Sequence, residues 1–263
     1  MVILLHSSKT MRSPSRGGSA YRAPQLIGKA QQLDAYLKTL PAAELVKIMG
    51  ISASLAAKTH DLIAGWNVQP AGQSLAIDSF VGDIYSRLQV SELSAADRDY
   101  ADKVLLILSG LYGVVRPYDG IHPYRLEMGY RMPDPAFANL YKFWGSSVAE
   151  CLPPSGLIVN LAAVEYSKTV TPYVDAARLV TPKFLTVAPK TGEPTFVVVH
   201  SKIARGAFAR WLIQSRITDR AALTGFQEIG YRFSPELSTP DQPVFVCQEF
   251  GGKGLSMRLQ VKP

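Results

Sequence analysis

The pattern of apolar and polar residues divides the chain into short buried strands and amphipathic helices. Continuous apolar runs, which are typical of strands buried on both faces, occur at 2–5, 157–161 and 196–199. Apolar residues spaced three or four apart, or residues that start and end helices, predict helices over 26–37, 41–50, 52–65, 94–108, 138–150 and 203–217. The last strands are expected at 231–233 and 244–247, and residues 80–85 are a strand or a turn into a helix.

Residues with known preferences for helix ends support three of these helices. Pro41 is a favoured first-turn residue, and Gly50 follows the same helix. Ser52 is a good N-cap for the next helix. Ser94 is followed three residues later by Asp97, whose charge suits a helix N-terminus, so we expect a capped helix that runs through Leu108 and breaks at Gly110.

Strands and helices alternate in this pattern without a regular repeat. We therefore predict an α/β (α+β) protein with a mixed central sheet flanked by helices. No segment divides the chain convincingly, which indicates a single compact domain over residues 1–250, followed by a basic tail at 251–263. Residues 11–24 are expected to form an irregular basic loop.

Composition excludes several classes of protein. With 47% hydrophobic and 19% charged residues in a chain of 263, the sequence is neither disordered nor fibrous. Two cysteines, Cys151 and Cys247, are too few for a disulfide framework. No signal peptide and no apolar run of about eighteen residues is recognisable, so we expect a cytoplasmic protein that does not enter a membrane. The net charge of +7 favours anionic partners.

Polar side chains follow the ends of predicted strands, where ligands often bind in open sheets. Ser8, Lys9 and Thr10 come after the first strand, and Asn160, Glu165 and Tyr166 accompany the strand at 157–161. Lys9 is able to hold an anion or, if desolvated, to act as a base; the alternative is a solvated loop lysine. Lys202 and Arg205 are three residues apart, so they share a helix face on which both can meet one anion, unless that face is simply solvated.

A second group of candidates lies between residues 108 and 131. Gly110 and Gly113 flank an apolar pair in a tight turn whose backbone N–H groups are able to hold a phosphate, although a purely structural turn is equally compatible. Arginines alternate with aromatic residues after this turn, as suits stacking on bases and pairing with phosphates. These residues are Tyr112, Arg116, Tyr118, Tyr124, Arg125, Tyr130 and Arg131. Glu127 is a lone acid among them, either a general acid or base or the partner of an arginine.

The histidines do not indicate a metal site. None of the four pairs with another at metal-ligand spacing. The sequence also lacks the glycine-rich motifs that bind dinucleotides or the phosphates of nucleoside triphosphates. We therefore predict neither a metal nor a cofactor.

Several segments resemble the YaaA family of bacterial peroxide stress proteins, in the family's order and approximate spacing. They are 8–10, 82–85, 108–117, 123–129, 140–145, 160–162, 165–166, 202, 204–206, 223–226 and 230–231. The chain lacks charged residues that the family carries in some of these segments, such as a lysine at the position of Val81, which indicates a divergent member.

The resemblance implies a fold particular to this family, with a positively charged cleft, a helix-hairpin-helix-like element and DNA binding in the peroxide stress response. By position, residues 108–114 would be that element. The basic residues of the cleft would include Lys9, Arg116, Arg125, Lys202 and Arg205.

The sequence is compatible with three functions. The first is binding of DNA. The second is an enzyme acting on a small anionic or nucleobase-like metabolite in a specialised biosynthetic pathway, in which Lys9, Glu127, Glu165 and Lys202 would supply acid–base and electrostatic groups. The third is an interaction protein without chemistry. Both DNA binding and the enzymatic function require the candidate side chains to lie together in one concave site.

Overall fold

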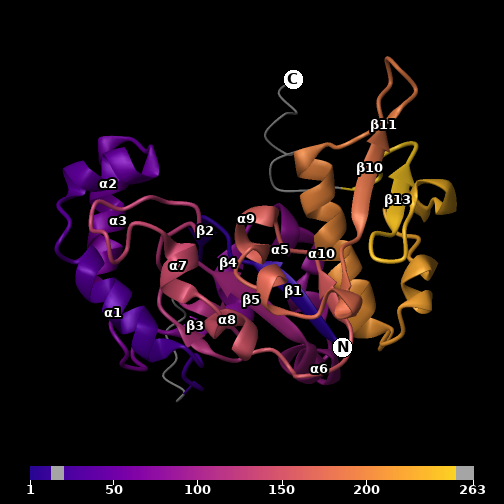
Figure 1. Cartoon of the computed structure of the whole chain (residues 1–263). Coiled ribbons are helices and arrows are strands. Elements are labelled where there is room, and N and C mark those ends of the chain that lie inside the picture. The colour runs from indigo at the N-terminus through magenta and orange to yellow at the C-terminus, as the bar shows by residue number, and fades with distance from the viewer. Residues whose placement is uncertain (13–20, 253–263) are drawn as a thin grey trace.

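The computed structural model describes residues 1–12 and 21–252. Most of the expected loop at 11–24 and nearly all of the expected basic tail at 251–263 therefore lie outside the described residues. Within them, the chain forms a mixed α/β structure in which helices flank the sheets, so the predicted fold class is confirmed (Figure 1).

The larger sheet has five strands in the order β6-β5-β1-β8-β9. β1 (Val2–His6) lies in the middle and pairs in parallel with β5 (Leu105–Ser109) and β8 (Ile158–Asn160). β9 (Leu179–Val180) continues the parallel order, whereas β6 (Gly113–Val115) pairs antiparallel with β5. Every residue of β1, β5 and β8 is buried, which is why these strands read as continuous apolar runs.

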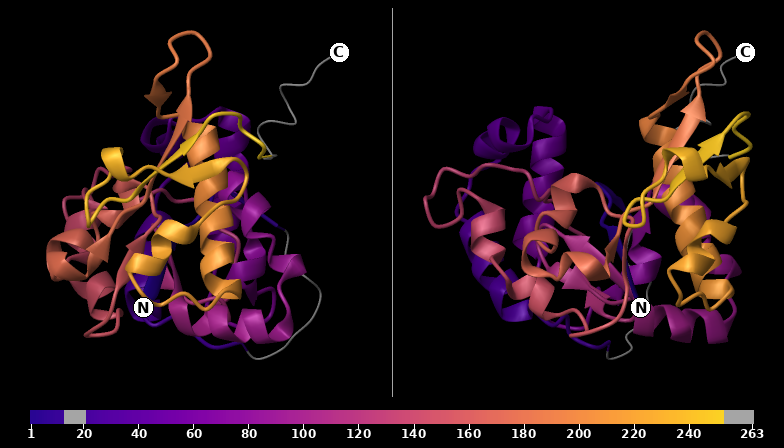
Figure 2. Two further views of the ribbon diagram at one scale, coloured as in Figure 1. Left: turned by 90° about the vertical axis from the view of Figure 1, so that its right-hand side faces the viewer. Right: turned by 45° about the vertical axis from the view of Figure 1, so that its right-hand side comes forward.

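The second sheet lies toward the C-terminus and has the strand order β11-β10-β13-β12. Its strands are β10 (Lys183–Val187), β11 (Pro194–Thr195), β12 (Tyr231–Phe233) and β13 (Val244–Cys247). The helix α10 (Val198–Gln214) contacts β10 on one side and α5 (Asp83–Leu88) on the other, so it joins the two parts of the molecule (Figures 1 and 2). Phe184, Phe208, Phe226 and Phe245 pack ring against ring between α10 and this sheet.

The remaining helices lie around the two sheets. The α-helices are α1 (Ile27–Leu37), α2 (Ala42–Met49), α3 (Ala53–Gly65), α4 (Ala76–Ser79), α5 (Asp83–Leu88), α6 (Ala95–Val104), α7 (Leu140–Trp144), α8 (Ser147–Glu150) and α9 (Val164–Ser167). Of these, α6, α8 and α9 contact the larger sheet. The short 3-10 helices are η1 (Val90–Glu92), η2 (Thr171–Tyr173), η3 (Ala176–Arg178), η4 (Ala221–Gly225) and η5 (Pro235–Leu237). Two strand pairs, β2 (Thr10–Met11) with β4 (Phe80–Val81) and β3 (Ser74–Leu75) with β7 (Gly120–Ile121), complete the fold. In the described part of the chain, no helix combines the length and the apolar character that crossing a membrane requires.

The predicted helix caps are confirmed. The hydroxyl of Ser52 accepts a hydrogen bond from the backbone N–H of Leu55 at the start of α3. Ser94 and Asp97 form a reciprocal capping box at the start of α6. Pro41 precedes α2, and Gly50 ends it in the left-handed conformation with φ of 60°.

Three predicted elements are wrong or incomplete, each for an identifiable reason. The helix expected over 94–108 ends at Val104, and the apolar run that follows is β5, because a run without a polar side suits a strand buried between two others. The strand expected at 196–199 is replaced by the start of α10; Phe196 and Val198 are each 55% exposed, so they do not enter a sheet. The helix expected over 138–150 is broken at Gly145, where φ is 51°.

The element expected to resemble a helix-hairpin-helix, residues 108–114, connects two strands. Ser109 of β5 pairs with Gly113 of β6, so the segment is the turn of an antiparallel hairpin. Gly113 has φ of 70°, and a Cβ atom there would lie 2.9 Å from the ring of Trp144. The glycine is therefore explained by backbone conformation and packing, and the helix-hairpin-helix prediction is wrong for these residues.

The close approach of α10 to α5 depends on Gly206. A Cβ atom at this position would clash with the backbone carbonyl oxygen of Ile84 in α5. Because that neighbour is backbone, it is not able to move without shifting the whole helix. Gly206 thereby sets how closely α10 packs against α5.

Replacement of Gly206 by alanine is therefore expected to lower the free energy of unfolding by about 1–3 kcal/mol, the usual range for overpacking. The measurement is denaturant unfolding of purified protein. The control is Gly28→Ala in α1, where a Cβ atom meets nothing within 4 Å and alanine favours the helix. Equal stability of the two variants would contradict this account of the α5–α10 contact.

Candidate functional site

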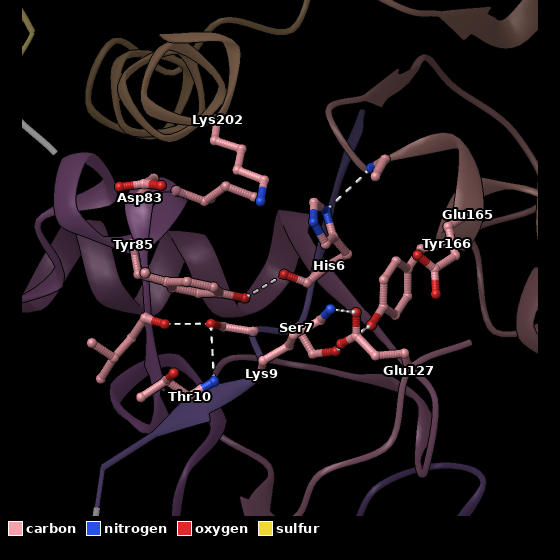
Figure 3. A pocket seen from close by; sticks show the side chains of 15 residues that line it. His6, Ser7, Lys9, Thr10, Asp83, Tyr85, Glu127, Glu165, Tyr166 and Lys202 are labelled. Atoms are coloured by element: carbon pink, nitrogen blue, oxygen red, sulfur yellow. Dashed lines mark hydrogen bonds and ion pairs between the residues drawn. The ribbon is translucent and has the colours of Figure 1, made fainter. Parts of the chain in front are cut away.

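A pocket of about 420 Å³ opens at the carboxyl ends of the parallel strands (Figure 3). The chain leaves β1 toward β5 on one side, whereas it leaves β8 toward β9 on the other side. The crevice between two strand ends whose connections diverge in this way is a common place for ligands in open α/β sheets. Residues 6–10, at the end of β1 and after it, form one wall of the pocket, and Ala163, Glu165 and Tyr166, after β8, form another. Residues 81–85, Glu127 and Lys202 complete it.

Glu127 is at the centre of the polar contacts in this pocket. Its Oε2 lies 3.3 Å from the Nζ of Lys9, and its Oε1 accepts a hydrogen bond of 3.0 Å from the hydroxyl of Tyr166. The Glu127 side chain is only 14% exposed, whereas the Lys9 side chain is 57% exposed at the mouth. The carboxylate is thus held in a defined orientation by two donors, as suits a group that accepts or delivers a proton.

Tyr166 connects Glu127 to the buried polar residues His6 and Ser7. Its ring stacks on His6 with centroids 4.9 Å apart, and the hydroxyl of Ser7 approaches its oxygen at 3.5 Å. Burial and, secondarily, the negative charge of Glu127 raise the pKa of Tyr166 far above its ordinary value. The phenol therefore keeps its proton and donates a hydrogen bond to the carboxylate of Glu127. Nearby Tyr124 bonds Ser109 at 2.6 Å, and burial raises the pKa of Tyr124 to about 12.

His6 is the buried last residue of β1 and is neutral. Burial first, then the charges of Arg205 and Lys202, lower the pKa of His6 to about 3. Its Nδ1 lies 3.2 Å from the backbone nitrogen of Ala163 and accepts that N–H, so in the neutral ring the proton is assigned to Nε2. The imidazole lies between Tyr166 and Lys202 (Figure 3).

Two cations from α10 lie beside His6. Lys202 lines the pocket, and Arg205 lies close enough to depress the pKa of His6. Desolvation lowers the pKa of Arg205 itself. Among residues 1–12 and 21–252, neither Lys202 nor Arg205 forms an ion pair. The α10 side of the pocket therefore carries two cations that form no ion pair in the described part of the chain, although the carboxylate of Asp83 also lines the pocket.

The structure brings together about half of the candidates chosen from the sequence. Those that line the pocket are Ser8, Lys9, Thr10, Glu127, Glu165, Tyr166 and Lys202. Glu165 is oriented by the backbone N–H of Gly129, which donates to its Oε1 at 2.8 Å. Arg125 donates to the carbonyl oxygen of Lys9 at 3.1 Å, and Tyr124 and Arg205 lie next to the lining residues.

The other candidates do not line the pocket, because each has a structural partner elsewhere. Tyr112 is 1% exposed, and its oxygen accepts hydrogen bonds from Trp66 and His122. Arg116 pairs with the buried Asp119 at 3.2 Å. Asn160 bonds the backbone of Ala162 and the hydroxyl of Thr181.

Gly110 and Gly113 do not line the pocket either. Gly110 packs against the backbone of Leu126, and Gly113 against Trp144. Like Tyr112, these two glycines are held by contacts with other segments of the same chain. The prediction that all candidate residues lie in one site is therefore wrong for Gly110, Tyr112, Gly113, Arg116 and Asn160.

Sequence reasoning missed some lining residues or gave them no role. The prediction from sequence tests the histidines only for metal-ligand spacing, whereas a histidine at the end of an apolar strand, such as His6, is itself a signal for a strand-end site. Tyr85 lines the pocket and donates to the carbonyl oxygen of His6 at 2.8 Å. Across the described residues, no group of three or more histidine, cysteine, aspartate or glutamate side chains is placed to hold a metal ion.

The neutral state of His6 has a measurable consequence for stability. Between pH 6.5 and about 3 the unfolded chain binds a proton at His6 that the folded protein does not bind. His6 therefore makes the free energy of unfolding fall with decreasing pH in this range, by up to about 1.4 kcal/mol per pH unit. We expect a shallower acid-side slope in His6→Asn, which keeps an acceptor for Ala163, measured by denaturant unfolding at several pH values. An NMR titration that shows His6 protonating near pH 6.5 would contradict the assignment.

Comparisons of the sequence with known proteins show its family. The family model described as "Peroxide stress protein YaaA" matches residues 1–237. The chain is similar to a UPF0246 protein of Salinispora tropica, with 59% identity over 258 residues that cover 98% of each chain. It is also similar to a UPF0246 protein of Ruegeria sp. (strain TM1040), with 37% identity over 253 residues that cover 94% of this chain and 99% of the relative. The chain therefore belongs to the YaaA family of peroxide stress proteins.

Proposed function

We propose that the protein binds a small anionic metabolite in the pocket at the end of β1 and carries out acid–base chemistry on it. The observation that carries this proposal is the convergence of Lys9, Glu127, Tyr166 and Lys202, from four separate segments, on one cavity. Such a convergence of titratable groups in a concave, partly desolvated site is typical of enzymes.

The size and depth of the cavity favour a metabolite as the ligand. A volume of about 420 Å³ is in the usual range for small-molecule sites. A DNA duplex is too wide to enter it and would reach only the side chains at the mouth. The deeper groups, such as Tyr166 with 2% exposure, are accessible only to a ligand that enters the pocket.

The contacts assign separate roles to the polar groups. Glu127 is a carboxylate beside the ammonium of Lys9, so it is suited to accept a proton from the bound ligand. Tyr166 retains its proton and stabilises the carboxylate by donating to it. Lys202, on the opposite wall, would stabilise negative charge on the ligand. In the cell, we expect this activity to serve the peroxide stress response that gives the family its name.

The decisive variant is Glu127→Gln, which keeps the size and polarity of the side chain but removes the base. We expect it to slow turnover by at least about 100-fold, the usual contribution of a general base. The measurement is mass spectrometry of a polar metabolite extract incubated with purified protein, which reports compounds that are consumed and formed.

The matched control is Glu193→Gln, a change of the same kind at an exposed position outside the pocket. It should convert the same compound at the rate of the unchanged protein. If Glu127→Gln is equally active, Glu127 has no role in the chemistry. If the unchanged protein alters the extract no more than heat-denatured protein does, the enzymatic function is rejected.

DNA binding is the second candidate, and the surplus of positive charge favours it. The net charge is +7, and Lys9 is 57% exposed at the pocket mouth with Arg125 hydrogen-bonded to its backbone. A duplex lying across the mouth would contact such side chains through its phosphates. This binding would need no base recognition, because phosphate contacts carry no sequence information.

If DNA binds in this way, its affinity should fall steeply with salt concentration, because neutralised phosphates release counterions. We expect Lys9→Gln to reduce the slope of log K against log salt by about 1. The control is Lys47→Gln on α2, whose lysine is 72% exposed and pairs with Glu44. Fluorescence anisotropy with a labelled duplex gives the affinities, and equal affinity at low and high salt would rule out this candidate.

A further inference from the structure

We propose that Lys202, Arg205 and the Nε2–H of His6 form a subsite that binds an oxyanion group, a carboxylate or a phosphate, at one end of the ligand. This inference rests on the proposed function for the statement that the ligand is a small anion. It adds which group of the ligand is recognised, by which residues, and how the ligand is oriented.

The geometry of α10 places the two cations together. Residues three and four apart lie on one face of a helix, and Lys202 and Arg205 are separated by three positions. Both act on the same target, since the charge of each lowers the pKa of His6. The turn of α10 from 202 to 205 therefore faces the end of β1, where Lys202 lines the pocket.

The two cations of this turn form no ion pair with a carboxylate of the described residues. Arg98 and Arg210, which are also partly buried, do form ion pairs, with Asp78 at 2.6 Å and with Glu228 at 2.9 Å. Desolvation lowers the pKa of Arg205. A desolvated guanidinium without a counterion is unfavourable, so the site is prepared for an anion supplied by a ligand.

His6 adds a hydrogen-bond donor to the subsite. Since Nδ1 of His6 accepts the N–H of Ala163, the Nε2–H of the neutral ring is available as a donor on the side of Lys202. Ser201, in the same turn of α10, is 1% exposed, and its hydroxyl has no hydrogen-bond partner among the described residues.

The positions of the charged groups orient the ligand. Lys202 lies on the α10 side of the pocket, which Asp83 of α5 also lines, whereas Glu127 and Glu165 lie on the opposite side, on the loop that carries Glu127 and on α9 (Figure 3). An oxyanion bound at α10 would direct the rest of the ligand toward Glu127. We therefore infer a substrate with a carboxylate or phosphate at one end and its reacting proton at the other.

The test is isothermal titration calorimetry of the full-length protein with inorganic phosphate and, separately, with malonate. We expect one site for at least one of these anions, and the tighter of the two identifies the recognised group. Lys202→Gln and Arg205→Gln should each weaken binding at least 10-fold. The control is Arg232→Gln, an exposed arginine of β12 that bonds Gln227 and should leave the affinity unchanged.

Further variants separate this subsite from the proposed chemistry and from a folding defect. Arg205→Lys keeps the charge and should restore part of the affinity if Arg205→Gln loses it. Glu127→Gln removes a negative charge and should bind the anion at least as tightly as the unchanged protein, even though it loses turnover. The subsite is rejected if Arg205→Gln binds like the unchanged protein, or if neither anion binds. Anion binding that depends on Arg205, together with full turnover by Glu127→Gln, would reject the proposed base instead.

Discussion

The parallel pairing of β1 with β5 and β8 is the constraint on which the site depends. Ile3 lies opposite Leu105 on one side and Val159 on the other, so all three strands end at the same edge of the sheet. Because the strands are fully buried, a shift in register would expose apolar side chains or bury polar ones, and the arrangement is strongly specified. The polar residues that follow β1 and β8 are thereby brought to one crevice from positions more than 150 residues apart.

The close contact between α10 and α5 supplies the opposite wall. Gly206 allows the two helices to approach, and the preceding turn of α10 then carries Lys202 to the crevice. The result is a pocket with the cation Lys202 on one wall and the ordered carboxylate of Glu127 on the other. Burial has two effects here: it keeps His6 neutral and Tyr166 protonated, and it strengthens the electrostatic interactions that a bound anion would experience.

The site was predictable from sequence where a polar residue follows a buried strand or has no local partner. Lys9, Glu165 and Tyr166 stand near predicted strand ends and lie in the pocket. The alternation of arginines and tyrosines that includes Arg116 and Tyr112 contains no information about which residues are close in space. Asp119 and Trp66, which hold them in structural contacts, are linked to them only by the folded chain.

Local chemistry in the sequence determined most helix boundaries and the class of fold, because caps, glycines and apolar spacing act over a few residues. It did not distinguish the apolar end of a predicted helix from the buried strand β5, since both are continuous apolar runs and only pairing with β1 decides between them. Likewise, the sequence contained the residues of the pocket without their roles. The pKa of His6 and the ion pair of Lys9 with Glu127 arise from burial and proximity, which tertiary structure alone creates.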